Sequence, residues 1–181
     1  MGHVKIIVDH EKIDYLGPVD CSGLFRLITN FVMERGFDMK TEKDFEHHTP
    51  SGIQLEWQGA PWKIMAGAEY ARHMIKIRIL GTDLKKVAIL KEGKKVKLDS
   101  GRLQIIIDGF LETDIDTRWE QNPLMLFIRS IYDNFVYKIY TERFEQRLVH
   151  DINQLSNSIK QFLNVNRRFK VISTPPDRPG F

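Results

Sequence analysis

The chain has 181 residues, of which 42% are hydrophobic and 28% charged, and its formal net charge at pH 7 is +3. These values are typical of a single globular domain that buries its own core, and they exclude disorder for most of the chain. The net charge is too small to indicate a nucleic-acid partner by itself. Cys21 is the only cysteine, which excludes an intramolecular disulfide and a cysteine-based zinc site and favours a reducing, cytoplasmic location.

The N-terminal part predicts a strand followed by a helix. Residues 4–15 are rich in valine and isoleucine, and their apolar run is too short for a signal segment or a membrane span. Asp20 is a good N-cap for a helix that extends to Arg35, and Gly36 suits the left-handed position that ends a helix. We therefore expect no transmembrane segment here.

From residue 37 the hydrophobic period is two, which predicts an antiparallel meander. Turn residues at 49–52, 81–83, 92–93 and 99–101 divide it, and an irregular connection is expected at 59–68. The six short strands predicted in this way cover residues 37–47, 53–57, 75–79, 87–89, 96–98 and 103–111.

A long amphipathic helix is predicted at 122–163. Asn122 suits the N-cap and Pro123 the first helical position, and apolar residues then recur with the spacing of one buried face. A straight helix of this length would exceed the compact domain, so we expect a kink or break between residues 134 and 141. The domain then covers 1–165, followed by an extended, basic, proline-rich tail at 166–181.

This order of elements over residues 4–163 resembles the helix-grip fold of the START and Bet v 1 superfamily, with one helix where that fold has two. The resemblance implies an α+β fold in which a curved antiparallel sheet packs on the C-terminal helix, often around an apolar ligand cavity. It therefore implies a non-catalytic binding protein for an apolar small molecule or lipid. Hydrolase or cyclase activity ranks last, because the sequence offers no catalytic constellation.

The candidate ligand-binding residues are the polar groups in the inward register of this sheet. Lys43 and His47 share that register, and Tyr132 or Tyr137 of the helix could meet them. A few polar groups inside an apolar pocket orient a ligand. The alternative is that Lys43 and His47 lie near a strand end and reach solvent.

No metal or cofactor site is predicted. His47 and His48 are adjacent on a strand, so their side chains point to opposite faces. The other histidines, His3, His10, His73 and His150, have no partner at ligand spacing. No glycine-rich phosphate loop, dinucleotide fingerprint or nucleophile elbow occurs.

The acidic residues at 108–116 and the single cysteine are given structural rather than catalytic roles. The carboxylates Asp108, Glu112, Asp114 and Asp116 alternate with apolar residues, which predicts a solvated face with ordinary pKa values. Cys21 begins the first helix, whose dipole would lower the pKa of the thiol, but no partner histidine is indicated. We expect it to be a small packing residue.

The densest positive charge lies on the hairpin at 85–97, and this gives a second functional hypothesis. An interaction module could dock on nucleic acid or another anionic partner there, with the tail extending the basic surface. The alternative is a solvated run that protects an edge strand. The residues concerned are Lys85, Lys86, Lys91, Lys94, Lys95, Lys97, Arg167 and Arg168.

Overall fold

The computed structural model describes residues 3–65, 68–91, 94–113 and 138–167. The elements are β1 (His3–Val19), α1 (Cys21–Glu34), β2 (Thr41–Thr49), β3 (Gly52–Gly59), β4 (Trp62–Met65), β5 (Ala68–Lys91), β6 (Lys94–Thr113) and α3 (Lys138–Arg167). The predicted α+β class is confirmed.

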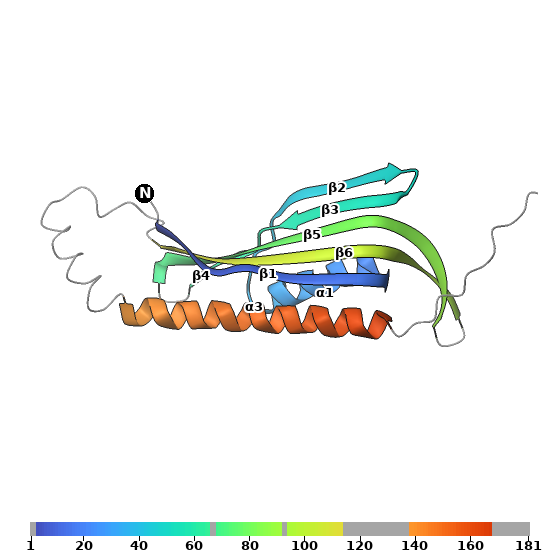
Figure 1. Ribbon diagram of the computed structural model, residues 1–181. Helices are drawn as coiled ribbons and strands as arrows, with labels where there is room; N and C mark the ends of the chain where they lie inside the picture. The colour runs from blue at the N-terminus through green and yellow to red at the C-terminus, as the bar shows by residue number, and fades with distance from the viewer. Residues whose placement is uncertain (1–2, 66–67, 92–93, 114–137, 168–181) are drawn as a thin grey trace, which may run out of the picture.

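All six strands belong to one antiparallel sheet in the order β1-β6-β5-β3-β2, with β4 paired to β5. Both helices lie on the same face of this sheet, and α3 runs along its length (Figure 1). Neither of the described helices covers the other face of the sheet, an arrangement that antiparallel sheets tolerate.

The core lies between the helices and the inner face of the sheet. The central strands turn Ile75, Ile77, Ile79, Leu103, Ile105 and Ile107 inward, and α3 turns Phe144, Leu148, Ile152, Leu155, Ile159 and Leu163 toward them. Helix and sheet lie close together at Gly109, where an added Cβ would collide with Cδ1 of Ile152. The helical spacing of this stripe, visible in the sequence, is therefore what docks α3 on the sheet.

α1 begins and ends as predicted. The Asp20 carboxylate accepts a hydrogen bond from the Gly23 amide at 2.9 Å, and Gly36 follows the helix with a φ of +73°. The Gly36 amide donates to Met33 O at 2.9 Å and the Phe37 amide to Val32 O at 3.0 Å, the pattern of a Schellman motif. This motif turns the chain back toward the sheet.

Two predicted turns are wrong, and so is the irregular connection that contained β4. Residues 81–83 and 99–101 lie inside β5 and β6, which are 24 and 20 residues long. They face each other across a bulge, in which Asp83 has a φ of +54° and a Cβ at Gly101 would lie 2.8 Å from Thr82 O. Gly101 is needed because the two backbones approach each other closely at this point. The four short strands predicted at 75–79, 87–89, 96–98 and 103–111 are therefore parts of two long strands, β5 and β6.

The C-terminal helix is described from Lys138 and ends at Arg167, four residues beyond its predicted end. Three parts of the prediction lie outside the described residues: the start at Asn122, the first half of the expected kink region, and the tail from residue 168. None of the described helices combines the length and the apolar character needed to cross a membrane.

Gly109→Ala should destabilise the protein by roughly 1–3 kcal/mol, because the new methyl group overpacks the contact with α3. Ile152→Val removes the colliding Cδ1, so Gly109→Ala should cost much less in that background. Urea unfolding of the two single variants and the double variant measures this coupling. Equal costs in both backgrounds would mean that α3 is not seated at Gly109.

Candidate functional site

The strongest candidate site lies where the end of α1, β4 and α3 meet. After the Schellman motif, Asp38 and Trp62 exchange backbone hydrogen bonds of 2.8 and 3.0 Å. This bridge brings Lys63 of β4 beside Arg35, the C-cap of α1. Lys63 Nζ lies 3.4 Å from Arg35 O. A cap and a short strand thus bring two cations to one place.

Asp151 of α3 is the carboxylate between these cations. Only 8% of it is exposed, and it accepts hydrogen bonds from Arg35 Nη1 at 2.7 Å and Lys63 Nζ at 3.1 Å. Arg35 also donates to Gln154 Oε1. The paired cations rest on aromatic rings, Arg35 at 4.3 Å from the Phe31 centroid and Lys63 at 4.1 Å from that of Phe37. Asp151 therefore joins three elements and is not a free base.

An open cavity of about 430 Å³ lies beside this carboxylate, between β4 and α3. Met65 contributes a buried apolar surface, while Arg143 and Arg147 of α3 are exposed. The lining residues are Lys63, Met65, Arg143, Gln146, Arg147, His150 and Asp151. Among the residues that the structure describes, neither Arg143 nor Arg147 has an ion pair.

His73 is a buried polar group next to this cavity. It lies opposite Lys63 in the β4–β5 ladder, is 0% exposed, and meets the Phe144 ring edge-on at 6.3 Å. Neither ring nitrogen has a hydrogen-bond partner in the described part of the chain. Burial, followed by the positive charge of Lys63, lowers the pKa of His73 to about 4. The ring is therefore neutral at pH 7.

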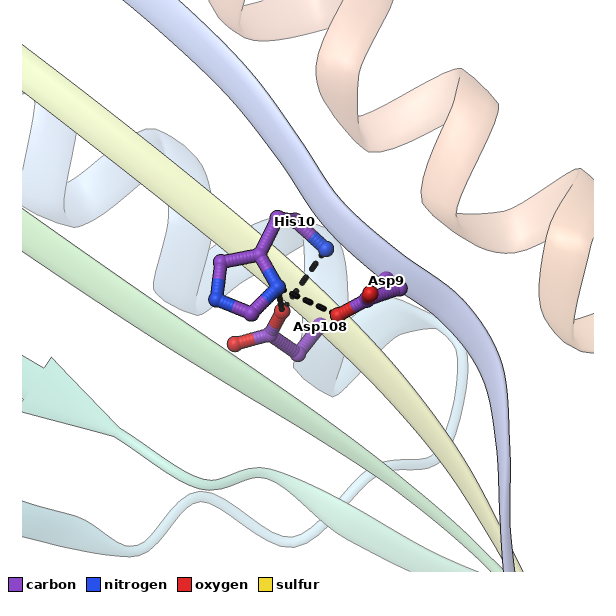
Figure 2. A group of neighbouring side chains, drawn as sticks. All are labelled: Asp9, His10 and Asp108. Atoms are coloured by element: carbon purple, nitrogen blue, oxygen red, sulfur yellow. Dashed lines mark hydrogen bonds and ion pairs between the residues drawn. The ribbon is translucent and has the colours of Figure 1, made fainter.

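A second polar cluster lies on the outer face of the sheet, around Asp108 (Figure 2). The register between β1 and β6 shifts on both sides of Val8, and His10 has a φ of +54°. The side chains of Asp9 and His10 consequently meet on one side, and the His10 amide donates to Asp108 Oδ1 at 2.9 Å. The expectation that His10 has no partner at ligand spacing is therefore wrong, because it assumed a regular strand.

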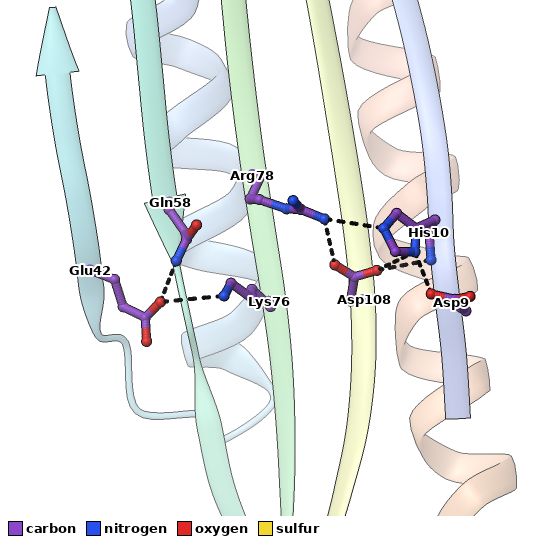
Figure 3. Close-up of polar contacts among 7 residues, drawn as sticks. All are labelled: Asp9, His10, Glu42, Gln58, Lys76, Arg78 and Asp108. Atoms are coloured by element: carbon purple, nitrogen blue, oxygen red, sulfur yellow. Dashed lines mark hydrogen bonds and ion pairs between the residues drawn. The ribbon is translucent and has the colours of Figure 1, made fainter. Parts of the chain in front are cut away.

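The ligand types in this cluster, one imidazole and two carboxylates within 4.8 Å of one another, suit a divalent transition metal. However, Arg78 Nη2 already binds Asp108 Oδ2 at 3.0 Å, and the side chains of His10 and Asp9 are 63% and 71% exposed. The same face continues into contacts of Glu42 with Gln58 and Lys76 (Figure 3). The cluster is explained as part of this cross-strand ion network, and we assign it no metal.

Asp108 also corrects the prediction of a solvated acidic face. Its side chain points away from the apolar core, as expected, but only 4% of the residue is exposed because its neighbours cover it. Glu112 is partly buried and paired with Arg72. Asp114 and Asp116 lie outside the described residues.

The candidate ligand residues Lys43 and His47 do not face the interior. Every residue of β2 from 41 to 48 is exposed, because β2 is an edge strand beyond the reach of α3. Lys43 forms an ion pair of 2.6 Å with Glu56. The alternative that both residues reach solvent is confirmed. Tyr132 and Tyr137 lie outside the described residues.

The basic hairpin is described in part. Beyond the bulge, residues 85–91 of β5 pair with residues 94–100 of β6, and we call this part the β5–β6 extension. Lys85, Lys86 and Lys97 are exposed on it, and Lys86 pairs with Asp99 at 2.6 Å. Lys91, Lys94 and Lys95 belong to the two strands by their backbones, and Arg167 is the last residue of α3. Their side chains, and all of Arg168, lie outside what the structure describes. Anion binding by this hairpin stays a prediction.

Cys21 packs against the core, as expected, but its electrostatics differ from the prediction. Burial, reinforced by the negative charge of Asp99, raises the pKa of the Cys21 thiol to about 12. Desolvation thus outweighs any effect of the helix dipole. At neutral pH the residue is a protonated thiol and a poor nucleophile.

Comparison of the chain with protein-family models, with curated proteins and with solved structures gave no match. The helix-grip resemblance therefore stays a prediction. The chemistry of the residues around the cavity is what indicates a function for this chain.

Sequence reasoning missed every residue that lines this cavity. Lys63 and Met65 fell in the expected irregular connection, and their pairing with β5 depends on tertiary contacts. A signal existed on α3, where Arg143, Arg147 and His150 recur at helical spacing on one polar face. What the sequence could not show is that this face borders a cavity.

Asp151→Asn should lower the free energy of unfolding by about 2 kcal/mol, because it leaves Arg35 and Lys63 partly buried without a counter-charge. Glu56→Gln is the matched control, since its pair with Lys43 is 40–50% exposed. The control should change stability by less than about 0.5 kcal/mol. Equal effects in urea unfolding would contradict the role given to Asp151.

The low pKa of His73 predicts a loss of stability in mild acid. Between pH 6.5, the ordinary value, and about 4, the unfolded chain binds a proton that the folded chain excludes. Stability therefore falls as pH falls through this window, by roughly 3 kcal/mol in total from this group. His73→Leu should remove that part of the dependence in urea titrations at several pH values. His48→Gln, at a site whose side chain is 74% exposed, should leave the dependence unchanged.

Proposed function

We propose that the chain is a non-catalytic binding protein that holds a small molecule in the cavity between β4 and α3. The observation that carries the proposal is the cavity itself, whose volume of about 430 Å³ lies within the range of about 300–1,000 Å³ typical of small-molecule sites. It lies between the sheet and the last helix, where the helix-grip resemblance implies a ligand.

The lining is more polar than that of the apolar cavity expected from the sequence, and it contains neither Lys43 nor His47. Met65 is 6% exposed and packs with Phe144 and Leu111, so it offers an apolar surface backed by the core. Polar and charged side chains of α3 surround it. Because six of the seven lining residues are polar or charged, the cavity suits a polar or charged molecule with a small apolar part.

Binding rather than catalysis is supported by the state of the reactive groups near the cavity. The Asp151 carboxylate is held by Arg35 and Lys63 and so is poorly suited to accept a proton. His73 is completely buried, which separates it from a substrate in the cavity. These groups support a site that holds a molecule without changing it.

Native mass spectrometry of gently purified protein tests the proposal. We expect a noncovalent small-molecule adduct on the wild-type chain. Gln146→Trp places a large side chain at the exposed α3 position that lines the cavity, so it should remove the adduct. Asn153→Trp, two turns further along α3 and also exposed, should retain it. A wild-type chain without an adduct, or an adduct indifferent to Gln146→Trp, would count against the proposal.

A further inference from the structure

The positive charge around the cavity exceeds what its carboxylate can neutralise. Asp151 is the one acidic residue among the lining residues that the structure describes, and both of its oxygens are occupied, one by Arg35 and one by Lys63. Arg143 and Arg147 line the same cavity and have no ion pair within the described ranges. Two guanidinium groups are therefore left without a counter-charge.

The two arginines are placed to act together. They are four residues apart on α3 and so lie one turn apart on the same side of the helix. Like charges at this spacing weakly destabilise a helix, and a bound anion would relieve that repulsion. Guanidinium groups bind oxyanions through two parallel hydrogen bonds, which lysine cannot do. Lys63 faces them from β4 and supplies a further positive charge.

The positive charges of this site also act on the buried His73. Both of its nitrogens lack partners although the residue is completely buried, and it sits directly beside Lys63 in the sheet. Burial is the main cause of the lowered pKa of His73, the charges of Lys63 and, more weakly, Arg147 add to it, and the charge of Asp151 opposes it.

We propose that the molecule bound in the cavity carries a phosphate monoester, whose oxygens contact Arg143 and Arg147 and whose charge is balanced in part by Lys63. Its apolar part would lie against Met65. A doubly charged oxyanion matches the two unpaired guanidinium groups better than a single carboxylate does. This inference rests on the proposed function and names the chemical class of its ligand.

Isothermal titration calorimetry of the full chain tests the inference with phenyl phosphate and with benzyl alcohol, an uncharged molecule that has the same aromatic ring. Phenyl phosphate should bind about tenfold more tightly than benzyl alcohol, or better. Arg143→Gln combined with Arg147→Gln should weaken phenyl phosphate binding by about tenfold or more. The matched control, Lys85→Gln combined with Lys97→Gln, removes two exposed cations from the β5–β6 extension and should not alter binding. All four substituted residues are exposed, so both double variants should fold.

The outcomes separate this inference from the proposed function. If both probes bind equally and Gln146→Trp abolishes binding of both, the cavity binds small molecules but the phosphate assignment is wrong. If phenyl phosphate binding is lost in the lysine variant and kept in the arginine variant, the anion site lies on the β5–β6 extension and the inference fails. If neither probe binds, the inference is overturned, whereas the proposed function is decided separately by the native adduct.

Discussion

The contact between the apolar stripe of α3 and the inner face of the sheet determines the rest of the structure. The stripe fixes how far α3 is rotated about its own axis, and the close approach of Ile152 to Gly109 fixes its position along β6. Because residues of a helix are about 100° apart, the side chains next to the stripe are then fixed too. Asp151 is adjacent to Ile152 and reaches Arg35 and Lys63, while Arg143 and Arg147 border the cavity. The site is thus a consequence of how the helix is seated.

The two faces of the sheet contribute to the protein in different ways, the inner face to stability and the outer face to solubility. The inner face carries the helices and the core, whereas the outer face is crossed by ion pairs such as that between Arg78 and Asp108. The bulge at His10 belongs to β1, which is one edge of the sheet. Irregular, charged edge strands resist pairing with other chains. This role explains the Asp9, His10 and Asp108 cluster without a ligand.

The sequence predicted those elements whose signals are local. α1 was placed almost to the residue, because Asp20 and Gly36 act through hydrogen bonds within one turn of the helix ends. The turns expected at 81–83 and 99–101 failed because glycine and aspartate also suit a bulge, and only the pairing of β5 with β6 distinguishes the two. Long-range pairing likewise decided the exposure of Lys43, which depends on β2 being an edge strand.

The candidate site could not be predicted because it also depends on contacts between residues far apart in the sequence. Its residues come from α1, β4 and α3, and they meet only after α3 has docked. Arg143, Arg147 and His150 recur at helical spacing on one polar face, but a solvated face and a binding face have the same pattern. The burial of His73 is equally invisible in the sequence, because it follows from Lys63 and Phe144 covering that position.

The central claim is that a ligand occupies the cavity beside Met65, and methyl NMR of the methionines tests it most directly. Met65 lines the cavity, whereas Met33 is 60% exposed on α1 and does not. On titration with phenyl phosphate, the Met65 methyl resonance should shift in a saturable manner while that of Met33 stays in place. Saturable binding that leaves the Met65 methyl resonance unchanged would contradict the account.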